Sequence, residues 1–165
     1  MLKISKMTDY GTLVLAELAA HPGEPTAARD IARRTGLGTA TVAKLLKALL
    51  HADLVSSQRG NQGGYQLART PAEISAAAII DAIEGPVALT ACSHPDAHCD
   101  LATVCGVGSA WQTISAGIHE ALAAISLDDM RHNRDIPAVI PLQLMPAGRR
   151  PVAQLPPSAK TGAHE

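Results

Sequence analysis

The spacing of apolar residues along the first part of the chain predicts three helices. Residues 4–20 carry apolar side chains at helical intervals, and a short segment rich in proline and glycine follows them. Two shorter helices are expected next, at about 26–35 and 39–52, with Gly36 as the break between them. Thr26 has the side chain of an N-cap residue and is expected to begin the first of these two helices.

A β-hairpin is expected directly after these helices. Residues 54–57 and 65–67 are strand-like, and a glycine-rich run from Arg59 to Gly64 separates them. The run predicts a hairpin with a flexible tip.

A long amphipathic helix dominates the second half of the chain. A helix at about 75–84 is expected to stop at Gly85, and a loop over 86–108 leads into the long helix at about 109–125. The apolar residues of the long helix follow a 3-4-4-3 spacing, and they are Trp111, Ile114, Ile118, Leu122 and Ile125. This spacing predicts a seam between paired helices; the alternative is a stripe that is covered within one chain.

Charge divides the chain in a way that its net value of −1 hides. Residues 1–70 have four more basic than acidic residues, whereas residues 71–130 contain eight acidic residues and no lysine or arginine. A basic first part favours a polyanion partner, although uneven surface charge alone is weak evidence. No secretory signal and no run of membrane-spanning length is visible, so we expect a cytoplasmic protein.

The first three predicted elements have the features of a helix-turn-helix. This motif needs a small residue where its helices approach, a glycine in the turn and apolar anchors on the second helix. Those requirements are met in order by Ala32, Gly36, Val42 and Leu45. With the hairpin as a wing, the arrangement predicts a winged helix-turn-helix that places its second helix in the major groove of double-stranded DNA.

The same arrangement nominates the residues that contact DNA. Base edges are expected to meet the start of the second helix, at Thr39, Ala40, Thr41 and Lys44. Phosphate contacts are expected from Lys47 and from Arg33 or Arg34, and a minor-groove or phosphate contact is expected from Arg59.

Three cysteines fall within the loop at 86–108. Cys92, Cys99 and Cys105 have the spacing Cys-x6-Cys-x5-Cys, and an odd number of thiols cannot pair internally. Gaps of this width are too long for the Cys-x2-Cys knuckle of a structural zinc site and suit a loop around a larger group. Spacing alone leaves an iron–sulfur cluster, zinc and unliganded thiols open.

Several motifs together resemble the Rrf2 family of bacterial transcription regulators. The stretch from Arg59 to Leu67 is similar to the family's Arg-Gly-x-x-Gly-Gly-Tyr-x-Leu wing, and the opening residues 4–10, residues 79–85 and the cysteine loop are also similar. Within the family the chain looks most like regulators of SUF iron–sulfur cluster assembly, partly through residues 84–90. The resemblance implies a homodimeric, iron–sulfur-sensing repressor that has no membrane association, no small-molecule substrate and no enzymatic activity.

The resemblance also bears on the fourth ligand of a cluster. IscR-like members have a histidine shortly after the third cysteine, but this chain has Gly106-Val107-Gly108 there. Asp9 lies where NsrR-like members supply a carboxylate from the partner subunit, which makes it the leading candidate beside a simple surface role. His94 and His98 are further candidates within the loop. Two-iron (2Fe-2S) and four-iron (4Fe-4S) clusters both stay open, with the two-iron form preferred by analogy.

These observations divide the chain into three parts. Residues 1–70 are expected to form the DNA-binding domain, and residues 71–132 to provide the connecting helix, the cluster loop, the dimerisation helix and one more capped turn at 126–130. Residues 133–165 lack periodicity and are rich in proline, alanine and glycine, which predicts a disordered tail.

Two rival functions use the same residues. A zinc- or thiol-based redox repressor would need the cysteines without iron. A Cys-His enzyme would need a nucleophile and a base, but no phosphate loop, hydrolase motif or metalloprotease motif accompanies these residues.

Overall fold

A computed structural model describes residues 4–60, 63–90, 93–94 and 106–132 of the 165-residue chain. The described part contains six helices and one two-stranded antiparallel hairpin, which confirms the predicted mainly helical fold with a wing. The elements are α1 (Lys6–Ala19), α2 (Ala28–Thr35), α3 (Thr39–His51), β1 (Val55–Gln58), β2 (Gly64–Leu67), α4 (Ala76–Glu84), α5 (Gly108–Ala123) and α6 (Leu127–Arg131). Residues 91–92 and 95–105 of the predicted cluster loop, and the predicted tail at 133–165, lie outside the described residues.

Branched aliphatic side chains and alanine build the core of the winged head, the part of the molecule formed by α1–α4, α6 and the hairpin. Because the chain has no phenylalanine, leucine, isoleucine and valine fill the space between the helices. The largest fully buried side chains come from every part of the head, and they include Leu15, Ile31, Leu46, Leu49, Leu54, Ile74 and Leu127. This continuous apolar cluster fixes α2 and α3 relative to α1.

Thr26 joins the hairpin instead of capping α2. Its backbone N–H donates to the Tyr65 carbonyl at 2.9 Å, and its carbonyl accepts from the Tyr65 N–H at 2.9 Å. This bridge holds Thr26 in a buried, extended position, so α2 begins two residues later with Ala27 as its N-cap residue. The prediction that Thr26 caps the helix is therefore wrong, because pairing with the wing satisfies its backbone groups.

Close backbone approaches explain two glycines of the wing. A Cβ on Gly64 would lie 2.6 to 2.8 Å from backbone atoms of Thr26, and a Cβ on Gly63 would overlap the Gln58 carbonyl oxygen. The strands pair in a register that sets Val55 opposite Leu67 and Gln58 opposite Gly64. Gly64 therefore lets the wing lie close to Thr26 of the head, and Gly63 lets the chain approach the end of β1.

The predicted capped turn after the long helix is confirmed as α6. Ser126 and Asp129 form a reciprocal capping box, and the Leu127 N–H donates to the Ile74 carbonyl at 2.7 Å. The Ala76 N–H donates to the Ile125 carbonyl at 2.8 Å. The end of α5 is thereby tied to the beginning of α4.

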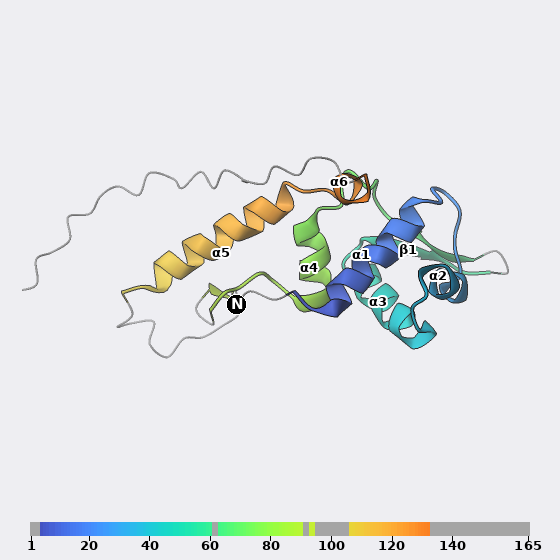
Figure 1. Cartoon of the computed structure of the whole chain (residues 1–165), viewed down its shortest axis with the longest axis horizontal. Helices are drawn as coiled ribbons and strands as arrows, with labels where there is room; N and C mark the ends of the chain where they lie inside the picture. The colour runs from blue at the N-terminus through green and yellow to red at the C-terminus, as the bar shows by residue number, and fades with distance from the viewer. Residues whose placement is uncertain (1–3, 61–62, 91–92, 95–105, 133–165) are drawn as a thin grey trace, which may run out of the picture.

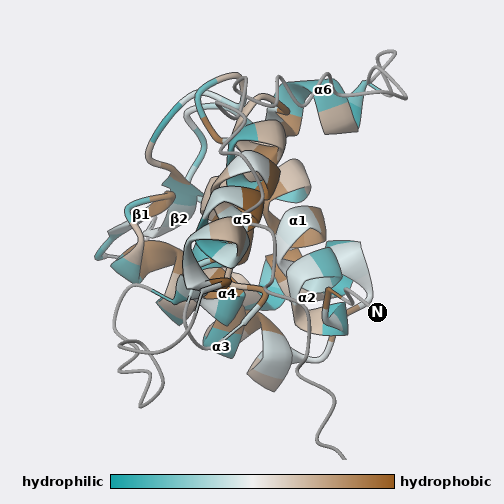
Figure 2. Cartoon of the chain, turned by 90° about the vertical axis from the view of Figure 1, so that its left-hand side faces the viewer, coloured by the Kyte–Doolittle hydropathy of each residue, from teal (hydrophilic) through white to brown (hydrophobic). Residues whose placement is uncertain are grey.

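From this attachment α5 projects away from the head (Figure 1). It packs against α4, while Trp111 and Ile114 in its first half are 39% and 43% exposed. Figure 2 looks from the side to which α5 projects and shows it in front of the head, with apolar positions along it.

Replacing Gly64 with alanine is expected to destabilise the protein. The added Cβ would press against the Thr26 backbone, and such overpacking costs about 1–3 kcal/mol in the free energy of unfolding. Urea denaturation followed by circular dichroism measures the change. Gly38→Ala is the control, because a Cβ there meets only the Thr41 Oγ1, at 3.8 Å. Equal stability of the two variants would contradict the role assigned to Gly64.

Candidate DNA-binding surface and sensor region

The turn between α2 and α3 sets the direction of the second helix. Gly36 ends α2 in the left-handed region with φ of 72°, a conformation that favours glycine. The Thr35 hydroxyl donates to the Ile31 carbonyl at 2.7 Å, and the Leu37 N–H donates to the Thr35 hydroxyl oxygen at 3.4 Å. The chain can then start α3 immediately, with Gly38 as its N-cap residue.

One face of α3 is anchored and the other is open. Val42, Leu45, Leu46 and Leu49 are 0–1% exposed, as the prediction for Val42 and Leu45 required. The opposite side presents small and basic residues to solvent: Thr39, Ala40, Ala43, Lys44 and Lys47. Thr41 is half-buried. An α-helix is about 10–12 Å across, so this open face matches the width of a DNA major groove.

The arginines of α2 have different surroundings. Arg34 donates to Glu17 of α1 at 3.2 Å and lies 3.3 Å from the His21 ring nitrogen, so it joins α2 to α1. The Arg33 side chain is 75% exposed, and its one ion pair within the described part of the chain is with Asp30 of its own helix, at 3.0 Å. Of the two arginines considered for phosphate contact, Arg33 is therefore the more available.

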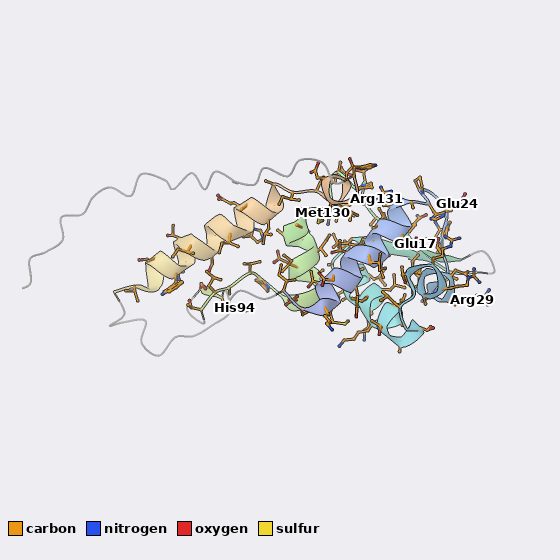
Figure 3. The ribbon with its side chains drawn as sticks, in the orientation of Figure 1. Glu17, Glu24, Arg29, His94, Met130 and Arg131 are labelled. Carbon is orange, nitrogen blue, oxygen red and sulfur yellow. The ribbon has the colours of Figure 1, made fainter. Side chains whose placement is uncertain are left out.

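Sequence reasoning missed Arg29 at the start of α2. Its side chain is 85% exposed, and Figure 3 shows it at the edge of the head, far from His94. The excess of basic residues over 1–70 was a signal, but it did not distinguish this arginine from the others. Arg59 is exposed directly after the end of β1, and not at the base of the wing, where the prediction placed it.

The cysteine segment, within residues 86–108, follows α4 in the sequence. Cys92, Cys99 and Cys105, with His98, lie outside the described residues, so their predicted ligand roles are not tested. Within the described ranges, no group of three or more histidine, cysteine, aspartate or glutamate residues could hold a metal ion. His94 is half-buried and lies next to the segment, under α5 in Figure 3.

Glu84 connects the end of α4 to the start of α1. Its Oε1 accepts a hydrogen bond from the Ser5 N–H at 2.8 Å and another from the Thr8 hydroxyl. A carboxylate at this position also interacts favourably with the α1 dipole. The Thr8 hydrogen bond and then the Ser5 N–H hold the pKa of Glu84 below its usual value.

Asp9 directly follows Thr8 in α1, and it is exposed. No hydrogen bond or ion pair to its carboxylate is found among the described residues. The Asp9 carboxylate therefore offers oxygen ligand atoms near the C-terminal end of α4, after which the cysteine segment begins.

Two polar contacts connect α5 with the elements before it. Asp81 of α4 lies 3.0 Å from the His119 Nε2, and the other Asp81 oxygen is buried without a partner in the described part of the chain. The Leu89 N–H donates to the buried hydroxyl of Ser115 at 3.2 Å. The segment entering the cysteine loop is thus joined to α5.

Comparison with known proteins decides the family. A family model described as Rrf2, iron-dependent transcriptional regulator, matches residues 4–133. The chain belongs to the Rrf2 family. The match includes the helix-turn-helix, the wing, the cysteine segment and α5, so the family resemblance predicted from the sequence motifs is confirmed.

The relatives of this Rrf2 protein include both IscR and CymR regulators. It is 30% identical over 139 residues to the transcriptional regulator IscR of Aliivibrio salmonicida, covering 84% of this chain and 82% of the relative. Solved structures that it resembles include T. potens IscR (34% identity, TM-score 0.58, 84% of this chain and 92% of that one). CymR, the global cysteine regulator of B. subtilis, is also similar (33% identity, TM-score 0.61, 82% and 100%).

These relatives are transcription regulators, which confirms the winged-helix fold and the prediction that this Rrf2 protein is not an enzyme. None of the helices in the described part of the chain has the length and apolar character needed to span a membrane.

The charge of Glu84 is expected to stabilise the Rrf2 head in a pH-dependent way. Because its folded-state pKa is lowered, its stabilising contribution is complete above the ordinary glutamate pKa of about 4.3 and is lost as pH falls through the lower, folded-state value. Glu84→Gln should reduce the free energy of unfolding at pH 7, and the difference from the unmodified protein should shrink on acidification.

Denaturant titrations between pH 7 and pH 3 measure this difference. Glu24→Gln is the control, because Glu24 is exposed in the loop after α1 and has no side-chain partner among the described residues. A Glu84→Gln effect that is the same at every pH would exclude the charge as its cause.

Proposed function

We propose that this Rrf2-family protein is a homodimeric repressor that binds a DNA operator and senses iron–sulfur status through its cysteine segment. The observation that supports it most is the open, basic face of α3 beside the wing, in a chain of an iron-dependent regulator family. SUF-type assembly genes are the proposed targets, because the motif at residues 84–90 resembles regulators of those genes.

The DNA-binding step follows from the exposed residues of the head. Lys44, near the start of α3, reaches base edges together with Thr39, Ala40 and Thr41, whose short side chains permit a close approach. Lys47, Arg33 and Arg59 contact phosphates or the minor groove from the rim of this surface. In a dimer, two such helices would occupy successive major grooves about 34 Å apart.

The sensing step uses residues on both sides of α4. Three thiolates within 14 residues, with an exposed carboxylate at Asp9, form a donor set that fits an iron–sulfur cluster. When bound, a cluster supplies a centre whose presence and charge depend on iron supply and redox conditions. We assign Cys92, Cys99 and Cys105 as ligands and Asp9 as a fourth ligand from the partner subunit, with the two-iron form preferred.

Contacts in the described structure connect the two steps. Glu84 ties the start of the cysteine segment to α1, and Arg34 ties α1 to α2 of the helix-turn-helix. A change in the cysteine segment can therefore alter the population of DNA-competent heads. The functional division remains residues 1–70 for DNA, 71–132 for sensing and pairing, and 133–165 as a tail.

Lys44→Ala is expected to weaken operator binding by about 5- to 150-fold and to relax discrimination at one base pair, because a base contact of this kind is worth about 1–3 kcal/mol. Arg33→Ala should weaken binding evenly across sequences and reduce the salt dependence by about one phosphate contact. Fluorescence anisotropy with operator and mismatched duplexes at several salt concentrations measures both effects. Arg131→Ala in α6 is the control, and an equal loss in all three variants would contradict the assigned surface.

Asp9→Ala is expected to lose its cluster faster than the unmodified protein while remaining dimeric. Anaerobic visible absorption, with iron, sulfide and zinc assayed on the same sample, follows the cluster, and sedimentation follows the dimer. Glu24→Ala is the matched control for removal of an exposed carboxylate. An unchanged cluster lifetime in Asp9→Ala would exclude Asp9 as a ligand.

The same assay tests the rival function. The similarity to CymR, a global cysteine regulator, favours a thiol- or zinc-based repressor as the second candidate. A colourless protein with stoichiometric zinc, or with three free thiols and no metal, would support that candidate and leave the DNA-binding proposal intact.

A further inference from the structure

A groove separates the end of β2 from the loop that follows α1. Its volume is about 550 Å³. Its floor includes Leu18 and Ala19 of α1, and its two walls include residues 21–23 of the loop and residues 67–71 between β2 and α4. The volume is more than three times the roughly 150 Å³ that holds one benzene-sized molecule, so the groove can take several aliphatic side chains.

The backbone of β2 presents an open edge to this groove. The N–H and the carbonyl of Tyr65 both bond to Thr26, so these groups point away from β1. Because the direction of backbone groups alternates along a strand, the N–H and the carbonyl of Leu67 point to the same side. No backbone hydrogen bond from Leu67 to a group outside the hairpin is found among the described residues. Leu67 therefore offers a donor and an acceptor to an extended segment in the groove.

The chain after α6 starts beside the same groove. The Asp128 N–H donates to the carbonyl of Pro71, which lines the groove, at 3.2 Å. The last described residue, His132, is one helical turn further on, which is about 6 Å along the helix axis. Figure 1 shows α6 next to α1, against which it packs. The chain continues from here to residue 165, so its own tail is near enough to reach the groove.

Residues 136–145 of the tail differ from the rest of it, because they contain no charged side chain and alternate in character. The even-numbered positions are all aliphatic and all have a backbone N–H: Ile136, Ala138, Ile140, Leu142 and Leu144. Two of the odd-numbered positions are Pro137 and Pro141. Proline is accepted in an edge strand where its nitrogen faces solvent. The pattern therefore favours an extended segment that pairs through its even-numbered residues.

We propose that residues 136–144 bind in this groove of their own chain and add a third strand to the wing, with Ile140 opposite Leu67. The new strand is antiparallel to β2, because β2 runs toward Pro71 and the tail starts beside Pro71. Residues that are opposite each other in such a pair have their side chains on the same face. Since Leu67 packs against the core, the Ile140 side chain covers the groove floor at Leu18.

This strand has a structural consequence that does not depend on the proposed DNA and cluster roles. An uncovered strand edge can pair with other chains, and the tail protects the open edge of β2 from such pairing. Its prolines, which face outward, prevent a further strand from adding to it. The strand also connects the end of α6 to the wing, so the position of the wing depends on the tail.

Amide hydrogen exchange of the full-length protein, followed residue by residue by NMR, tests the pairing. The Leu67 amide should exchange at least about tenfold more slowly in the unmodified protein than in Ile140→Asp, which sets a charge against the apolar floor. Val139→Asp is the matched control, because it makes the same change on the solvent side and should leave the rate unchanged. The Gln66 amide faces Ser56 of β1 and should stay protected in all three proteins, which shows that the wing is folded.

A second pair of variants tests the backbone without adding charge. Ile140→Pro removes the N–H that donates to Leu67 and should also speed exchange of the Leu67 amide. Val139→Pro removes an N–H that faces solvent and should not.

Equal exchange of the Leu67 amide in the unmodified protein and in Ile140→Asp would overturn the inference, because some other group would then occupy the groove or it would be open. Protection that appears only at concentrations where sedimentation shows a dimer would assign the groove to the tail of another copy, and would overturn binding within one chain.

Discussion

The close packing of α1 against α4 is the constraint on which the rest of the structure depends. Gly11 has no side chain, and a Cβ in its place would overlap the end of Ile83 on α4. At the same interface Glu84 satisfies the Ser5 N–H and the Thr8 hydroxyl. Since α1 also packs on α2 and α3, and α4 itself packs on α3, the helix that leads into the cysteine segment is connected to the DNA-binding surface both directly and through α1. Any rearrangement at the end of α4 therefore acts on α1 directly.

Local patterns in the sequence predicted the helices and the wing because their causes are local. Apolar periodicity, Gly36 in the turn and the glycine-rich run before Tyr65 all act over a few residues. The position of Thr26 was predicted wrongly because its partner, Tyr65, is 39 residues away in sequence. The local pattern predicts a helix cap at Thr26, but Thr26 forms a strand bridge with Tyr65 that only the tertiary fold creates.

The candidate site shows the same division between local and distant causes. The exposed face of α3 could be predicted, since burial of Val42 and Leu45 forces the intervening side chains outward. The choice between Arg33 and Arg34 could not, because it depends on Glu17 of another helix. The link from Glu84 to Ser5 spans 79 residues and has no sequence signature. Cysteine spacing alone likewise does not distinguish a cluster from zinc, since both accept thiolates.

The composition of the core makes the position of Trp111 informative. The chain has no phenylalanine and builds its head from aliphatic side chains, yet its single tryptophan lies on α5, outside that core. An aromatic ring of this size buries roughly 150–250 Å² when covered, which makes an exposed position costly unless another surface covers it. An apolar groove lined by Leu122 and Ile125 lies at the opposite end of the same helix, so apolar surface is open at both ends of α5. The exposed indole therefore marks a part of α5 that a partner surface would cover in the proposed homodimer.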